Sequence, residues 1–228
     1  MNARRRVPLL LLLAAAGIVL ASCSALDVVG SRAISTFQTL LDTVTGSVAL
    51  DGATNRWVLT SEGGERFEWS ADFSGAAPSF LISFDATPFL TAGLDASKLP
   101  SGRYSFDAAS KSLALSFDVG REKFTYDGTA TPLETFKKIV NAHRPIIGYH
   151  AALDHYGIAL GDGNMFEWAK DMAKNDKDIV FVLNPEPFKA AGVDPARITG
   201  WIFTKIPVKD ASGKTVDVDK FVKPYNLK

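Results

Sequence analysis

Histidine and carboxylate side chains that could do acid–base chemistry gather in the C-terminal half of this sequence. All three histidines, His143, His150 and His155, fall within thirteen residues, and Glu167 and Asp171 follow shortly after them. A carboxylate within reach of an imidazole is a common arrangement in general acid–base catalysis. One hypothesis is therefore a hydrolase that uses Glu167 and Asp171 with a nearby histidine, His150 or His155.

A metal site is a second hypothesis, since these histidines together with Asp154 or Asp162 could ligate zinc. Two observations argue against it. His150 and His155 are five residues apart, so one straight strand would direct them to opposite faces. The segment Gly161–Asn164 lacks the alternating acidic ligands and the terminal glutamate of a calcium loop. We expect neither a bound metal nor another cofactor, and metal binding stays open as an alternative.

Motifs of other enzyme classes are missing from the sequence. No Gly-x-Ser-x-Gly elbow, phosphate-binding loop or two-histidine helix motif occurs. The chain has 25 basic and 25 acidic residues, a balance that argues against a nucleic-acid-binding protein. We therefore expect a non-enzymatic function, with the carboxylate-based hydrolase kept as the alternative.

The N-terminal residues have the features of an export signal. Arg4–Arg6 precede an apolar run, Val7–Ala21. This run is 15 residues long, which is shorter than the ~20 residues needed to span a bilayer. The segment Leu20-Ala21-Ser22-Cys23, which ends this region, resembles the lipobox of bacterial lipoproteins.

This resemblance implies that residues 1–22 are a signal peptide and that Cys23, the only cysteine, becomes the lipidated first residue. The protein is then exported and held in the cell envelope by its lipid. Because Ser24 rather than aspartate follows the cysteine, the resemblance implies the outer membrane if the source has two membranes. Loss of three arginines with the signal takes the net charge from zero to −3.

Internal duplication is the clearest feature of the remaining sequence. At an offset of 99 residues, positions 36–99 show 13 identities to positions 135–198 without a gap, where typical residue usage gives roughly four by chance. Phe67-Glu68-Trp69 recurs as Phe166-Glu167-Trp168, for example. The predicted organisation is a tether, a first repeat, a linker and a second repeat, at residues 23–33, 34–120, 121–131 and 132–228.

Each repeat predicts one helix followed by antiparallel strands. Phe37, Leu40 and Val44 have the spacing of a helix with one buried face, and Thr131–Glu134 form a capping box before the second helix. Apolar segments then indicate several strands and a final hairpin. The turn of this hairpin lies at an offset of 103 residues, so the second repeat has gained four residues before it. The predicted fold class is α+β, a tandem duplication of a helix-on-antiparallel-sheet module. In element order alone it is similar to cystatin-like folds and to the β-lactamase inhibitor protein.

Trp201 distinguishes the second repeat, because Gly102 occupies the corresponding position of the first. The leading hypothesis is a lipid-anchored binding protein. Its partners are the membrane, through Cys23, and an envelope protein or small ligand held between the repeats. The candidate ligand-binding residues are Trp201, His150, His155, Glu167 and Asp171.

Overall fold

The computed structural model describes residues 29–44, 48–72, 78–118, 125–142, 146–151, 153–174, 178–209 and 212–225. The predicted signal peptide, Cys23 and His143 lie outside these residues. The predicted tether overlaps a helix, because residues 29–33 are already helical and Ala33 is fully buried.

The first repeat forms a six-stranded antiparallel sheet, called sheet A below. Its strands are β1 (Val48–Asp51), β2 (Arg56–Thr60), β3 (Arg66–Ser70), β4 (Phe80–Asp85), β5 (Tyr104–Asp107) and β6 (Ser112–Phe117). They lie in the order β1-β2-β3-β4-β6-β5. Between β4 and β5 the chain forms a short helix, α2 (Thr87–Thr91), and a 3-10 turn, η2 (Ala96–Lys98).

The second repeat forms sheet B with the same arrangement. Its strands are β7 (Ile147–His150), β8 (His155–Ala159), β9 (Met165–Ala169), β10 (Ile179–Leu183), β11 (Ile202–Lys209) and β12 (Thr215–Tyr225). Their order, β7-β8-β9-β10-β12-β11, matches that of sheet A. The equivalents of α2 and η2 are α4 (Glu186–Ala190) and η4 (Pro195–Arg197). From β1 to η2, each element begins 99 residues before its counterpart, as the predicted duplication requires.

Two longer helices carry the predicted apolar faces. Phe37 and Leu40 are fully buried in the helix of residues 29–43, and so is Phe136 in α3 (Pro132–Ala142). The predicted capping box precedes α3. The backbone N–H of Thr131 donates to the Glu134 carboxylate at 2.7 Å, and that of Glu134 donates to the Thr131 hydroxyl at 3.3 Å. Both helix patterns are thereby confirmed.

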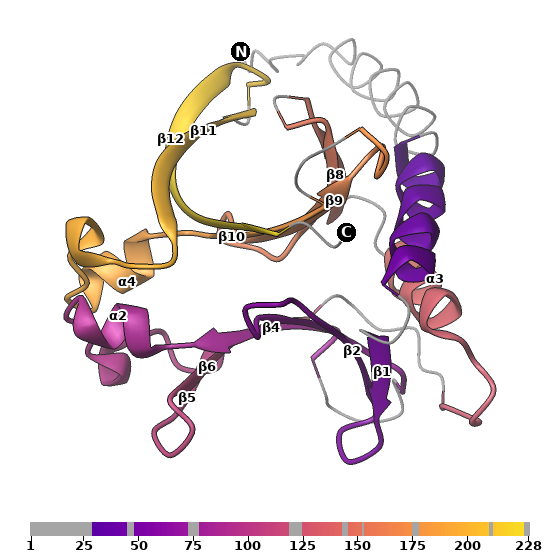
Figure 1. Cartoon of the computed structure of the whole chain (residues 1–228), viewed down its shortest axis with the longest axis horizontal. Coiled ribbons are helices and arrows are strands. Elements are labelled where there is room, and N and C mark those ends of the chain that lie inside the picture. The colour runs from indigo at the N-terminus through magenta and orange to yellow at the C-terminus, as the bar shows by residue number, and fades with distance from the viewer. Residues whose placement is uncertain are drawn as a thin grey trace, which may run out of the picture.

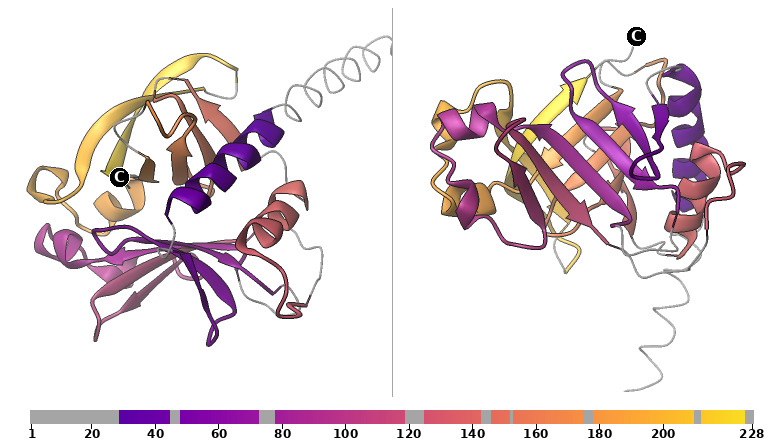
Figure 2. Two further views of the ribbon diagram at one scale, coloured as in Figure 1. Left: turned by 45° about the vertical axis from the view of Figure 1, so that its right-hand side comes forward. Right: turned by 90° about the horizontal axis from the view of Figure 1, so that it is seen from below.

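The two sheets face each other across one shared core (Figure 1). The helix of residues 29–43 and α3 lie side by side at one end of this sandwich, and α2 and α4 lie together at the other (Figures 1 and 2). The expected modules, each with a helix covering its own sheet, therefore differ from the observed packing. An 11-residue helix such as α3 is about 16 Å long and 10 Å wide, whereas six strands span about 24 Å. The other sheet therefore covers the part of the sheet face that the helix leaves uncovered.

Equivalent residues of the two repeats meet each other in this core. The rings of Phe37 and Phe136 stack with centroids 3.8 Å apart, and those of Phe67 and Phe166 stack at 4.0 Å. Backbone hydrogen bonds are also exchanged reciprocally between the α2 and α4 regions. The Asp95 N–H donates to the Ala191 carbonyl at 2.8 Å, and the Asp194 N–H donates to the Ala92 carbonyl at 2.9 Å. This is the contact pattern of a two-fold dimer within one chain.

The final hairpin breaks the symmetry. Leu113 pairs with Phe84 in sheet A, and Phe221 pairs with the equivalent Leu183 in sheet B. The next strand pair in sheet A joins Asp107 to Ser112, and it is therefore equivalent to the pair of Thr204 with Lys220 in sheet B. Four residues lie between Asp107 and Ser112, whereas fifteen lie between Thr204 and Lys220. The predicted gain of four residues before the turn understates the change, because the hairpin as a whole gains eleven residues. We call residues 205–219 the flap; residues 210 and 211 lie outside the description.

Strongly curved strands direct the flap back over the outer face of sheet B. In Figure 1, β12 arches away from sheet A and β11 follows it toward β8 and β9. Ile206 of the flap joins Val180, Val182 and Val222 in a small buried cluster, against which Val208 also packs. The flap therefore builds a second, separate apolar cluster, outside the main core.

Candidate functional site

A histidine and a carboxylate from two strands of sheet B form a pair. The Nδ1 atom of His150 lies 3.1 Å from a carboxylate oxygen of Glu167. Glu167 is fully buried, and the His150 side chain is 11% exposed. Of the sequence candidates, these two are brought together by the fold.

Strand register explains why the two side chains meet. His150 of β7 pairs with His155 of β8, and Gly157 of β8 pairs with Glu167 of β9. Directly paired residues share a face of a sheet, so all of these positions lie on the outer face of sheet B. The expectation of opposite faces for His150 and His155 is wrong, because a turn separates them. His155 is buried beside His150, but its Nδ1 lies 2.5 Å from the Leu153 carbonyl oxygen and not against Glu167.

Glycine makes room for the Glu167 side chain. A Cβ atom on Gly157 would lie 2.9 Å from the Glu167 Cγ atom. The equivalent residue of the first repeat is Val58. The second repeat therefore leaves a space over its glutamate that the first repeat fills.

Electrostatics favour the charged form of His150. The hydrogen bond to Glu167 raises the pKa of the imidazole above its ordinary value, while burial opposes the shift. The backbone of Pro207, in the flap, raises the pKa further. Since proline has no N–H, its carbonyl must supply this effect. The Nε2 atom is buried and makes no regular hydrogen bond within the described residues.

The equivalent glutamate of the first repeat, Glu68, is neutralised by a different cation. A carboxylate oxygen of Glu68 lies 3.2 Å from Arg56 Nε, and another is 3.4 Å from Arg66 Nε. Arg56 corresponds in position to His155, yet Glu167 pairs with His150 instead. A buried carboxylate needs a counter-charge in either repeat. This supports a structural origin for the conserved position of the glutamate in both copies.

Lys220 is a second buried cation in the second repeat, at the base of the flap. It is 4% exposed, and its Nζ atom donates to the Gly163 carbonyl at 2.7 Å. Burial lowers the pKa of this ammonium group. Lys220 therefore fastens the base of the flap to the turn between β8 and β9.

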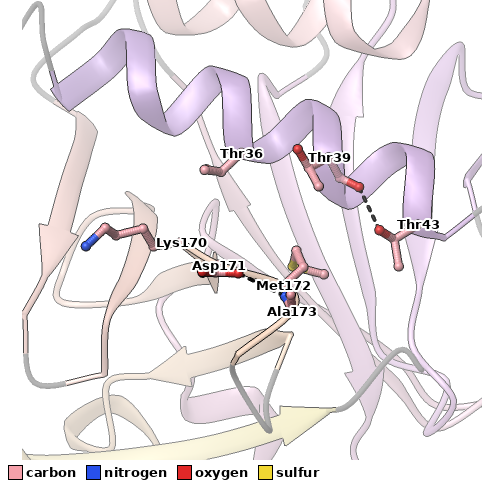
Figure 3. A pocket seen from close by; sticks show the side chains of 7 residues that line it. All are labelled: Thr36, Thr39, Thr43, Lys170, Asp171, Met172 and Ala173. Atoms are coloured by element: carbon pink, nitrogen blue, oxygen red, sulfur yellow. Dashed lines mark hydrogen bonds between the residues drawn. The ribbon is translucent and has the colours of Figure 1, made fainter.

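A groove lies at the seam between the repeats, and Asp171 lines it. The groove has a volume of about 560 Å³. Its walls are three threonines of the helix of residues 29–43 and a loop after β9, as Figure 3 shows: Thr36, Thr39, Thr43 and residues 170–173. The symmetry-related helix α3 has Lys138 and Ala142 in place of Thr39 and Thr43. The row of threonines is therefore specific to one side of the molecule.

The polar groups of the groove already have protein partners. Asp171 lies 2.9 Å from the ammonium of Lys174, and Lys170 lies 3.1 Å from Asp154. The Thr43 hydroxyl donates to the Thr39 carbonyl at 2.8 Å, so its oxygen remains available only as an acceptor. The groove thus presents methyl groups, hydroxyl oxygens and compensated charges.

Trp201 lies in the shared core rather than on a surface. It is 5% exposed and packs edge-on against Phe84 and Phe89 of the first repeat, with ring centroids 5.3 and 5.7 Å apart. The strand register corrects the sequence alignment here: Phe106 pairs with Leu113 as Phe203 pairs with Phe221, so the counterpart of Trp201 is Tyr104 and not Gly102. The Tyr104 ring packs edge-on against Phe188 at 5.7 Å, which mirrors the contact of Trp201 with Phe89.

The described residues contain neither a candidate metal-ion site nor a membrane-spanning helix. No three His, Cys, Asp or Glu residues there are grouped to hold a metal ion. None of the helices within the same residues is both long and apolar enough to cross a membrane.

The fold and the groove define an α+β protein built from two copies of one unit. Comparisons with protein-family models, with curated proteins and with solved structures found no match.

Three features were missed from the sequence: the threonine row, the flap and the buried Lys220. The threonines could have been found, because Thr36, Thr39 and Thr43 follow helical spacing beside the apolar stripe. Lys220 gives no such signal, since its burial depends on the curvature of β12.

Proposed function

We propose that this protein is a membrane-anchored lipoprotein of the cell envelope that binds a protein or small ligand at the seam between its repeats. One observation carries the anchoring. The lipobox-like segment ends at Cys23, and Val29, six residues later, is already helical. Six extended residues reach about 20 Å. A lipid on Cys23 would therefore hold the folded body beside the membrane.

The groove supports the binding part of the proposal. Ligand sites favour the boundary between domains or repeats, and this groove joins a helix of the first repeat to a loop of the second. Its charges, Lys170 and Asp171, are compensated by Asp154 and Lys174. A neutral polar molecule or an uncharged segment of a protein suits such a surface better than an ion.

A hydrolase remains the less favoured alternative. The contact between His150 and Glu167 supports it, but the other elements of that hypothesis do not join the pair. Asp171 is paired with Lys174, and the His155 ring contacts Leu153. The Nε2 atom, which would have to reach a substrate or nucleophile, is buried.

Substitution of Cys23 tests the anchoring. We expect Cys23→Ala to accumulate as an unprocessed precursor that incorporates no labelled palmitate, because the thiol that accepts the lipid is gone. Ser24→Ala is the matched control and should be processed and labelled normally. Palmitate labelling, intact mass and partition into a detergent phase measure these outcomes. A Cys23→Ala protein with the mass and membrane attachment of the wild type would refute the proposal.

Photo-crosslinking tests the groove separately. A photoreactive phenylalanine analogue at Thr39 places the probe on its wall, and the same analogue at Lys138 occupies the symmetry-related position. In intact envelopes of the lipidated protein, we expect a discrete adduct from position 39 and none from position 138. Equal labelling at both positions, or none at position 39, would contradict binding at the seam.

A further inference from the structure

We propose that the groove at the seam binds a neutral saccharide, and that Tyr149 beside it is the surface on which a sugar ring stacks. This inference rests on the proposed binding function of the groove and names the class of its ligand. Four features of the molecule support it: the hydrogen bonds of the threonines, the pairing of the nearby charges, the exposed tyrosine and the difference between the two repeats.

The threonine hydroxyls of the groove are placed to accept hydrogen bonds from a ligand. Thr39 and Thr43 each donate their proton to a helix carbonyl four residues earlier, at 3.3 and 2.8 Å. Thr36 donates to the Ala33 carbonyl at 3.0 Å and accepts from Trp168. A hydroxyl has one proton and two lone pairs, so lone pairs remain on the exposed Thr39 and Thr43 for donors of the ligand.

This pattern suits a saccharide better than a polypeptide. An extended peptide brings as many carbonyl acceptors as N–H donors, and the threonine row would leave those carbonyls without a donor. A sugar hydroxyl can turn to donate or to accept. The threonine methyl groups and the side chain of Met172, which faces them in Figure 3, offer apolar contacts. A sugar ring carries C–H and O–H groups in alternation and matches this mixed surface.

The charges beside the groove favour a neutral ligand. Lys170 lies 3.1 Å from Asp154, and Asp171 lies 2.9 Å from Lys174. An anion or a cation would have to compete with one of these ion pairs for its counter-charge. A neutral sugar can use the remaining donors of Lys170 and the remaining lone pairs of Asp171 while both pairs stay intact.

Tyr149 supplies an exposed aromatic ring next to the groove. Lys170, which lines the groove, has its Nζ atom 5.2 Å from the centroid of this ring. With the lysine in place, Tyr149 is still 43% exposed, and its hydroxyl is hydrogen-bonded to Asp154. An aromatic face is electron-rich and attracts the weakly positive C–H groups of a sugar ring.

The first repeat lacks this combination at its equivalent seam. The pairing of Tyr149 with Tyr156 matches that of Leu50 with Trp57, so the two backbones correspond there. Five positions differ in chemistry between the two seams: Tyr149, Asp154, Lys170, Thr39 and Thr43 correspond to Leu50, Asn55, Ala71, Lys138 and Ala142. The fold tolerates either set of side chains, so the aromatic ring, the ion pair and the two outer threonines are specific to the groove.

The chemical class of the photo-adduct at position 39 tests the proposal. The full lipidated protein with the photoreactive analogue at Thr39 is irradiated in intact envelopes, and the adduct is digested with a protease for mass spectrometry. We expect the groove peptide to carry repeating mass increments of neutral sugars and to react with a hydrazide label only after periodate oxidation. An added polypeptide or lipid would overturn the saccharide proposal and leave binding at the seam intact. Absence of any adduct would contradict both.

Variants of Tyr149 test the stacking surface in the same experiment. Tyr149→Phe keeps the ring and should keep the yield of the sugar adduct, whereas Tyr149→Ala should lower it about fivefold. Leu50→Ala, at the equivalent position of the first repeat, is the matched control and should leave the yield unchanged. Equal yields from Tyr149→Phe and Tyr149→Ala would overturn the proposal.

Thermal unfolding shows whether Tyr149→Ala is folded. If it is not, Thr43→Val decides, because valine keeps the shape of the side chain and removes the acceptor oxygen. We expect this variant also to lower the adduct yield about fivefold, the factor for one hydrogen bond. A yield equal to that of the wild type would then refute the saccharide site.

Discussion

Gly93 and Gly192 lie so close together that neither position has room for a side chain. A Cβ atom on Gly93 would be 2.7 Å from the Gly192 carbonyl oxygen, and one on Gly192 would be 2.9 Å from that of Gly93. Both residues have positive φ angles, +108° and +99°. Glycine adopts such angles without steric cost, and the contact between the two residues is a second reason for glycine.

Gly93→Ala should destabilise the protein by about 3 kcal/mol, because left-handed strain and a backbone clash act together. Gly102→Ala is the matched control. Gly102 also has a positive φ, +80°, but an added Cβ would meet nothing within 4 Å. It should cost only about 1 kcal/mol. Urea unfolding measures both variants, and equal losses would show that the contact between the glycines contributes nothing.

Each repeat binds the tryptophan of the other through a helix threonine. Trp168 Nε1 donates to the Thr36 hydroxyl at 2.9 Å. Trp69 Nε1 donates to both Thr135, at 3.2 Å, and the Pro132 carbonyl, at 2.9 Å. Thr36→Val should therefore cost about 2 kcal/mol by leaving a buried N–H without its acceptor. Thr135→Val should cost less than half as much, since Pro132 still accepts. The reverse order in thermal unfolding would contradict this account.

Glu65 joins the repeats by a second, ionic route. This buried carboxylate is 2.8 Å from Lys223 Nζ and accepts hydrogen bonds from Tyr225 and, at 2.8 Å, from Ser61. Burial alone would raise its pKa, but the bonds from Lys223, Tyr225 and Ser61 outweigh burial and lower it. A lowered carboxyl pKa stabilises the fold above the ordinary value and loses that effect as the pH falls through the lowered one.

Glu65→Gln should consequently reduce stability at pH 7 by about 2 kcal/mol and flatten the acid limb of the stability curve below about pH 4.5. Glu62→Gln, in the same turn but exposed, should leave both the stability and the acid limb unchanged. Denaturant unfolding across this pH range makes the comparison. An acid limb in Glu65→Gln as steep as that of the wild type would assign the pH dependence to other groups.

Local patterns predicted the elements of this fold well, whereas its packing depended on long-range relations. The apolar helix face that includes Phe37 and the capping box at Thr131 depend only on residues close together in the sequence. The duplication was found from identical residues 99 positions apart. The face occupied by His150 depended instead on a turn that reversed the chain before His155.

The flap shows why part of the candidate site could not be predicted. Two similar turns, near Lys111 and Gly213, both adopt positive φ angles. Alignment of these turns concealed the longer insertion, because similar turn chemistry occurs at the ends of hairpins of any length. Asp171 was named from the sequence only as a candidate residue. The structure places it at the seam, where the threonines opposite it belong to the other repeat and are distant in the sequence.

The exchange of threonines between repeats also constrains how the chain folds. A core that joins Thr36 to Trp168 cannot close until most of the second repeat is present, and closing so long a loop slows folding. Until the second repeat has been synthesised, Phe37 and Phe67 of the first repeat therefore lack their stacking partners and remain exposed to solvent. If the N-terminus is tethered early, as proposed above, the chain spends this interval beside the bilayer with these aromatic rings exposed.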